Sequence, residues 1–77
     1  MTTLDQLKPG QRARVHSVRE TEGTIYQRLL EMGLFEGTEV EVVRFAPLGD
    51  PMELLLHGYN LSLRKSEAAT VEVEVSS

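Results

Sequence analysis

The segment from Arg28 to Pro51 constrains this chain most, because it reads as a helix end, a turn, a strand and a loop without interruption. A short amphipathic stretch stops at Gly33, where a helix can end on a left-handed residue. Alternating apolar and polar residues then predict a strand that ends near Phe45. A stretch rich in proline and glycine follows, which is typical of a loop.

Length and composition favour one small domain, residues 1–77, because 77 residues leave no room for a second core. The absence of cysteine excludes disulfides and a thiolate zinc site. The longest uninterrupted apolar run is Leu54 to Leu56, too short for a signal peptide or a membrane span. We therefore expect a cytoplasmic chain that is not itself inserted in a membrane.

The charge balance argues against nucleic acid as a partner. The formal net charge is −4 and the pI is about 5.0, so a phosphate backbone would be repelled rather than attracted. The few aromatic residues are also too dispersed along the chain for a base-stacking platform.

Five short strands are predicted, with one helix between the first two. The helix is expected over residues 25–32, and Thr24 with Gln27 has the form of a capping box at its start. The doubled valines Val42 and Val43 shift the alternation by one residue, which predicts a β-bulge. A hairpin turn is expected at residues 58–60, and the predicted strands cover residues 11–18, 39–45, 52–57, 61–63 and 70–75.

This order of elements favours a mainly β fold, a small five-stranded SH3-like barrel with a short helix inserted between strands 1 and 2. An OB fold is the main alternative, but it usually carries its helix between strands three and four and needs a longer chain. Leu4 and Leu7, three residues apart, are predicted to form one helical turn that caps the open end of the barrel.

The predicted helix carries an apolar arc wider than a single core-facing stripe needs. Tyr26 and Leu30 form the edge of that arc. Either the N-terminal leader, residues 2–10, packs over them, or they are available to a partner. We take Tyr26, Leu30 and the outward-facing Leu55 as candidate partner-binding residues, together with Leu48 and Asp50 in the loop at residues 47–51.

Metal chemistry is limited to two histidines. His16 and His57 are the only imidazole ligands, and Glu53 is expected to share an outward strand face with His57. An opportunistic divalent transition-metal site on the surface is the most that this pattern predicts, and a solvated histidine is the simpler interpretation. No required cofactor is expected.

No catalytic residues are predicted. The serines have no neighbouring histidine and aspartate in the sequence, and no nucleophile elbow is present. The glycines around Phe35 lack the Gly-Lys-Ser/Thr ending of a phosphate-binding loop.

The chain resembles the FeoA family, the small ferrous iron transport A proteins. The resemblance is carried by RLLEMGL, GTEVEVVR and APLGDP between Arg28 and Pro51, by LSLRKSEA between Leu61 and Ala68, and by the final VEVEV. It implies an SH3-like barrel, no enzymatic activity and a cytoplasmic role beside FeoB, the membrane iron transporter whose cytosolic part is a GTPase.

Three functions are kept open at this point. The first is an accessory protein that binds the cytosolic GTPase-containing part of a FeoB-type transporter and modulates its activity or assembly. The alternative is a small transition-metal-binding or metal-responsive SH3-like domain. The third is an SH3-like peptide binder that uses Tyr26 and Tyr59 as its groove. A weak homodimer is compatible with each of them.

Overall fold

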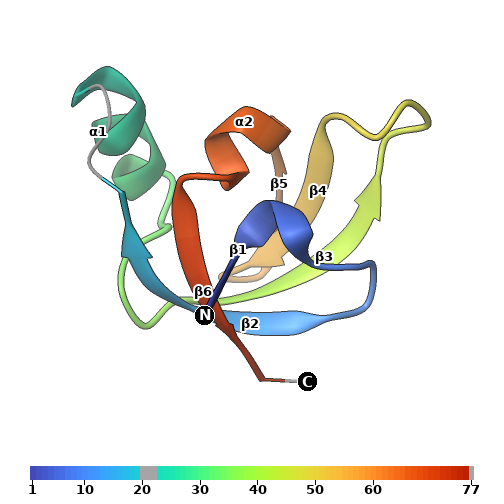
Figure 1. Ribbon diagram of the computed structural model, residues 1–77, viewed down its shortest axis with the longest axis horizontal. Helices are drawn as coiled ribbons and strands as arrows, with labels where there is room; N and C mark the ends of the chain where they lie inside the picture. Colours follow the sequence, from blue (N-terminus) through green and yellow to red (C-terminus); the bar gives the residue numbers. More distant parts are fainter. Residues whose placement is uncertain (20–22, 77) are drawn as a thin grey trace.

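One antiparallel sheet of six strands bends around the core (Figure 1). The computed structural model describes residues 1–19 and 23–76, without the side chains of residues 23 and 24. Along the sheet the strand order is β1-β6-β2-β3-β4-β5. The elements are β1 (Thr2–Thr3), η1 (Leu4–Gln6), β2 (Arg12–Val18), α1 (Gly23–Glu31), β3 (Glu39–Phe45), β4 (Met52–Leu56), β5 (Tyr59–Leu63), α2 (Lys65–Ala68) and β6 (Val71–Val75).

The predicted strands and the helix between the first two long strands are present. Two details differ from the prediction. The two-residue strand β1 adds a sixth strand beside β6, and a short helix, α2, lies between β5 and β6. The predicted capping box rests on the Thr24 side chain, which lies outside the described residues.

The predicted hairpin turn at residues 58–60 was wrong, because Tyr59 and Asn60 already belong to β5. Leu56 pairs with Tyr59, so the turn consists of His57 and Gly58 alone. Both have positive φ, 51° at His57 and 79° at Gly58, as the common two-residue hairpin turn requires. Histidine seldom adopts this conformation, which is why the sequence placed His57 in the strand.

Inward-facing residues of the strands form most of the core. Leu4 and Leu7 are also buried, and η1 packs against α2 and β6, so the leader caps the barrel as expected. Among the described residues, the buried apolar residues of the core are Leu4, Leu7, Ala13, Val15, Leu29, Leu34, Val40, Val42, Met52, Leu54, Leu56, Leu63, Ala68, Val71 and Val73.

Two irregularities bend the strands. The predicted bulge is confirmed, since the pairing of β3 with β4 shifts between Val42 and Arg44. A second shift, which was not predicted, occurs between Val15 and Ser17 where β2 pairs with β6. This second shift brings Ser17 beside Glu72.

The Glu72 carboxylate is held by donors on Ser17 in β2 and on Arg19, which follows β2. The Ser17 hydroxyl donates to Glu72 Oε1 at 3.0 Å, and the Arg19 guanidinium lies 3.2 Å from Oε2. The Ser17 hydrogen bond, followed by that from Arg19, lowers the pKa of Glu72 below its ordinary value.

Because its pKa is lower in the folded protein, Glu72 should stabilise the fold above the pKa of the unfolded chain. That stabilisation should disappear as the pH falls through the folded value. We expect Glu72→Gln to be less stable than the wild type near neutral pH, with the difference shrinking below about pH 4. Urea titrations from pH 3 to 7 measure it, and Ser17→Ala should reproduce part of the effect. A difference independent of pH would contradict this assignment.

Candidate functional site

The loop between β3 and β4 is fixed at both ends. The Gly49 N–H donates to the Ala46 carbonyl at 2.7 Å, and the Ala46 N–H donates to the Pro51 carbonyl at 2.9 Å. Residues 46–49, with Pro47 at the second position, therefore form a hydrogen-bonded β-turn. Asp50 ties the loop to α2, because its Oδ1 accepts the Lys65 N–H at 3.0 Å.

Leu48 stands at the tip of this fixed loop and is 98% exposed. Figure 1 shows the loop projecting beside β4 on the same side of the barrel as α1 and α2. A large apolar side chain held in water on a fixed loop loses little conformational freedom on binding, so its burial by a partner would be favourable.

The helix edge predicted for docking is less exposed than expected. Tyr26 and Leu30 are half-buried on α1, and Leu29 between them in the sequence is fully buried. The leader does not supply that cover, because η1 packs against α2 and β6, away from α1 (Figure 1). Tyr26 and Leu30 therefore offer a partial apolar surface at the side of the molecule.

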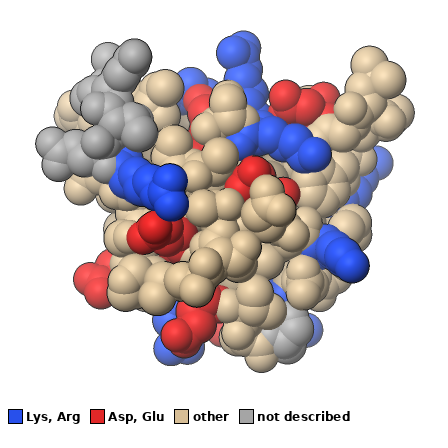
Figure 2. All heavy atoms as spheres, in the orientation of Figure 1, with Lys and Arg blue, Asp and Glu red and all other residues tan. Residues whose placement is uncertain are grey.

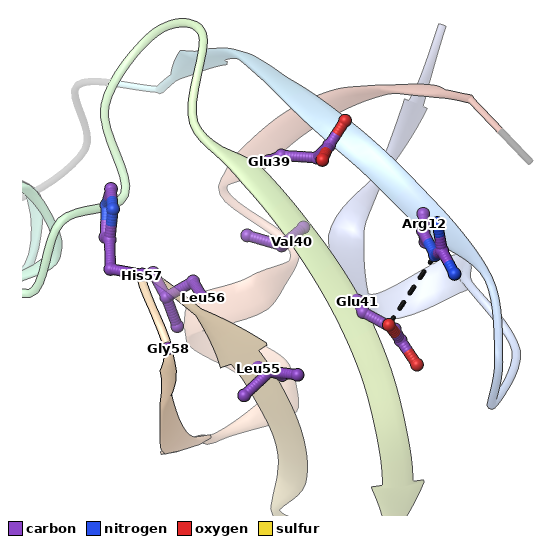
Figure 3. A pocket seen from close by; sticks show the side chains of 8 residues that line it. All are labelled: Arg12, Glu39, Val40, Glu41, Leu55, Leu56, His57 and Gly58. Carbon is purple, nitrogen blue, oxygen red and sulfur yellow. Dashed lines mark ion pairs between the residues drawn. The ribbon is translucent and has the colours of Figure 1, made fainter.

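Leu55 lies on a different surface from the loop. It is 38% exposed and lines a shallow hollow of about 210 Å³ on the outer face of β2, β3 and β4 (Figure 3). In that hollow Arg12 pairs with Glu41 at 3.5 Å. The five residues predicted to dock a partner thus lie on a loop, a helix edge and a strand face.

A cluster of three rings was missed by the sequence analysis. The ring centroids of Phe35 and His57 are 6.0 Å apart, and those of His57 and Tyr59 are 6.5 Å apart. Phe35 and Tyr59 are 49% and 44% exposed. These residues come from the loop before β3 and from the β4–β5 hairpin, so no local pattern in the sequence could have joined them.

The three predicted metal ligands do not come together. His57 lies in the hairpin turn with Nε2 3.4 Å from the Gly33 carbonyl, and Glu53 pairs with Arg44 at 3.0 Å. His16 lines a separate hollow beside Glu36 and Glu74. Within residues 1–19 and 23–76, no group of three histidine, aspartate or glutamate residues could hold a metal ion.

An ion pair between a buried carboxylate and an exposed arginine joins the two helices. Glu67 of α2 is only 5% exposed, and its Oε2 lies 2.8 Å from Arg28 Nη1 of α1. Its Oε1 accepts the Arg64 N–H at 3.1 Å, so both carboxylate oxygens have a donor. Arg28 thus has a partner on the neighbouring helix although 53% of its side chain is exposed.

Charges on the face shown in Figure 2 are interspersed. Lysine and arginine atoms alternate with aspartate and glutamate atoms, without one broad basic surface on this face. In the part of the chain that the structure describes, no helix is long and apolar enough to cross a membrane.

The fold and its surface define a small SH3-like barrel domain whose exposed features are a fixed apolar loop, a helix edge and a ring cluster. The FeoA domain model matches residues 2–75, and the chain belongs to the FeoA family. This family acts in ferrous iron transport, as small accessory proteins rather than as known enzymes.

A curated relative from Porphyromonas gingivalis (strain ATCC BAA-308 / W83) joins two proteins in one chain. It is an Fe(2+) transport protein A/Fe(2+) transporter FeoB fusion protein, 42% identical over 74 residues. The match covers 96% of this chain but only 9% of the length of that relative.

Solved structures of FeoA proteins share the fold. FeoA from Chlorobium tepidum is 41% identical with a TM-score of 0.89, covering 99% of this chain and 71% of that one. The zinc-complexed FeoA of Stenotrophomonas maltophilia, described as a prokaryotic SH3 domain protein, is 34% identical with a TM-score of 0.84. That match covers 96% of this chain and 91% of the other, and it confirms the SH3-like fold.

Gly33 offers a test of how α1 is held against the hairpin. Its φ is 98°, and an added Cβ would lie 3.0 Å from His57 Cδ2. We expect Gly33→Ala to lower the free energy of unfolding by about 2–3 kcal/mol, through the left-handed backbone and the contact with the ring.

Gly37→Ala is the matched control, because Gly37 has a φ of 90° but nothing within 4 Å of an added Cβ. It should cost about 1 kcal/mol, the backbone term alone. His57→Asn, which keeps a residue that tolerates positive φ, should recover part of the Gly33→Ala loss. If chemical denaturation shows the same loss of unfolding free energy for Gly33→Ala and Gly37→Ala, the contact with the His57 ring does not contribute to the loss.

Proposed function

We propose that this chain is a non-enzymatic, cytoplasmic accessory protein of ferrous iron uptake. It binds the cytosolic GTPase-containing part of a FeoB-type transporter and modulates the activity or assembly of that transporter. The observation that carries the proposal is the Porphyromonas gingivalis relative, in which a protein A segment and FeoB share one polypeptide. Segments fused in one chain are held at high local concentration, which favours partners that act together.

The docking surface that we propose is centred on Leu48. The loop is held by its own turn and by the Asp50–Lys65 hydrogen bond, so Leu48 is presented without a large ordering cost. Lys65 adds to this support, since its Nζ lies 5.0 Å from the centre of the Phe45 ring. The α1 edge at Tyr26 and Leu30 would extend the contact beside α2.

A metal-responsive domain is the second candidate. The specific observation in its favour is that the Stenotrophomonas maltophilia FeoA was crystallised with zinc. In this chain, however, the described residues contain no group of three suitable ligands, so a site would need donors from a second molecule. We therefore rank it below the docking function.

Replacing Leu48 tests the proposed surface. We expect Leu48→Gln to weaken binding to the isolated cytosolic region of the FeoB-type transporter by about tenfold or more. The reason is that burying a leucine side chain contributes about 1.5–3 kcal/mol. Calorimetric titration measures the affinity. Repeating it with GDP and with a GTP analogue shows whether the affinity depends on the nucleotide bound to the transporter.

Val75→Thr is the control, because Val75 is 44% exposed near the C-terminus, at the other end of the barrel from the loop (Figure 1). It should bind as the wild type does. Unchanged affinity for Leu48→Gln, with the fold intact by circular dichroism, would reject the loop as the docking surface. No binding by the wild type with either nucleotide would reject the proposed function itself.

A further inference from the structure

Strand β5 is an edge of the sheet. It pairs with β4 on one side, and no strand pairs with it on the other in the described part of the chain. Tyr59, Asn60 and Ser62 are exposed, whereas Leu61 is half-buried against the core. An open edge presents main-chain donors and acceptors to any strand that can lie beside it.

The hairpin fixes which main-chain groups of β5 face outward. Leu56 and Tyr59 flank a two-residue turn and so form a hydrogen-bonded pair, after which hydrogen bonding alternates along the strand. Leu61 and Leu63 therefore bond to β4, while the N–H and C=O groups of Asn60 and Ser62 point away from it. No turn or loop hydrogen bond in the described residues uses those groups.

The strand also lacks the usual features that protect an edge. Between His57 and Arg64 there is no charged residue and no proline. Natural edge strands often carry lysine, proline or an inward-pointing charge to prevent pairing. The neutral stretch Tyr59–Leu63 is therefore open to pairing although the chain as a whole carries a net charge of −4.

We propose that β5 pairs with β5 of a second copy of this chain, antiparallel and centred on Leu61. In that register Asn60 lies opposite Ser62 of the second copy, and the two residues exchange both of their main-chain hydrogen bonds. The symmetry repeats the same pair on the other side of Leu61. The outward-facing groups thus satisfy one another without any change in the barrel.

A second copy fits this edge because the side chains in the register do not repel. On the outer face Glu53 neighbours Ser62 and Leu55 neighbours Asn60 within one copy. Across the dimer, each line of neighbouring side chains on the outer face would run from Glu53 and Ser62 of one copy to Asn60 and Leu55 of the other. No like charges would then lie side by side. The net charge of each copy opposes association at long range, so added salt should strengthen the dimer.

Ser62→Pro is the first test, measured by sedimentation equilibrium over a range of protein and salt concentrations. Proline removes the outward N–H of Ser62 but no bond to β4, and edge strands tolerate it at such positions. We expect the wild type to dimerise reversibly and Ser62→Pro to weaken dimerisation at least about tenfold. Ser62→Thr, which keeps the N–H, should dimerise as the wild type does.

Cross-linking tests the register independently, because the chain contains no cysteine. Paired residues in a hydrogen-bonded antiparallel position have Cα atoms about 5.5 Å apart, within the reach of a disulfide. A mixture of Asn60→Cys and Ser62→Cys should form a mixed disulfide dimer under mild oxidation. Either variant alone should cross-link poorly, since its cysteines would lie on a diagonal about 7–8 Å apart.

Three results would overturn the proposal. They are a wild type that stays monomeric at millimolar concentration in high salt, a dimer that Ser62→Pro leaves unchanged, and equal cross-linking in all three cysteine samples. Thermal unfolding of each variant serves as the check that the barrel is intact.

Discussion

The end of helix α1 at Gly33 is the constraint on which the arrangement of this molecule depends. Gly33 is in the left-handed conformation, and its N–H donates to the Leu30 carbonyl while the Leu34 N–H donates to the Leu29 carbonyl. This pair of bonds is the Schellman motif, and it turns Leu34 into the core beside Leu29. A residue with a Cβ would meet the His57 ring at this point.

The same helix end is joined to the rest of the barrel through its carbonyl groups. The Gly33 carbonyl accepts from the buried Thr38 hydroxyl at 2.8 Å, and the Met32 carbonyl accepts from the Tyr59 hydroxyl. Carbonyls at a helix terminus otherwise lack partners. Here they are satisfied by the loop before β3 and by the β4–β5 hairpin, so the helix direction is set by groups from two distant segments.

These contacts decide which surfaces are left for function. The helix end holds α1 beside the barrel, and the Arg28–Glu67 pair ties it to α2. Helix α2 in turn holds the β3–β4 loop through Lys65 and Asp50. The apolar tip at Leu48 and the edge of α1 are thus connected through α2, which gives the proposed docking surface a rigid base.

Patterns that repeat along the chain predicted much of the fold, because strand alternation and helix ends are local properties. Strands β3 and β6, the bulge at Val42 and the helix end at Gly33 were predicted in this way. The turn at His57 was misplaced, since nothing local marks a histidine with positive φ. The ring cluster of Phe35, His57 and Tyr59 depends on contacts between distant segments, which one sequence does not reveal.

We propose above that the β3–β4 loop and the edge of α1, which lie on either side of α2, both contact the transporter. Titrating the isotope-labelled protein with the isolated cytosolic region of a FeoB-type transporter, and following each backbone amide by NMR, tests it most directly. We expect the perturbed amides to cluster at residues 46–50 and along α1, while those of β2 stay unchanged. Perturbed amides confined to β2 and to the strands that pair with it, β3 and β6, with the loop amides unchanged, would contradict this docking surface.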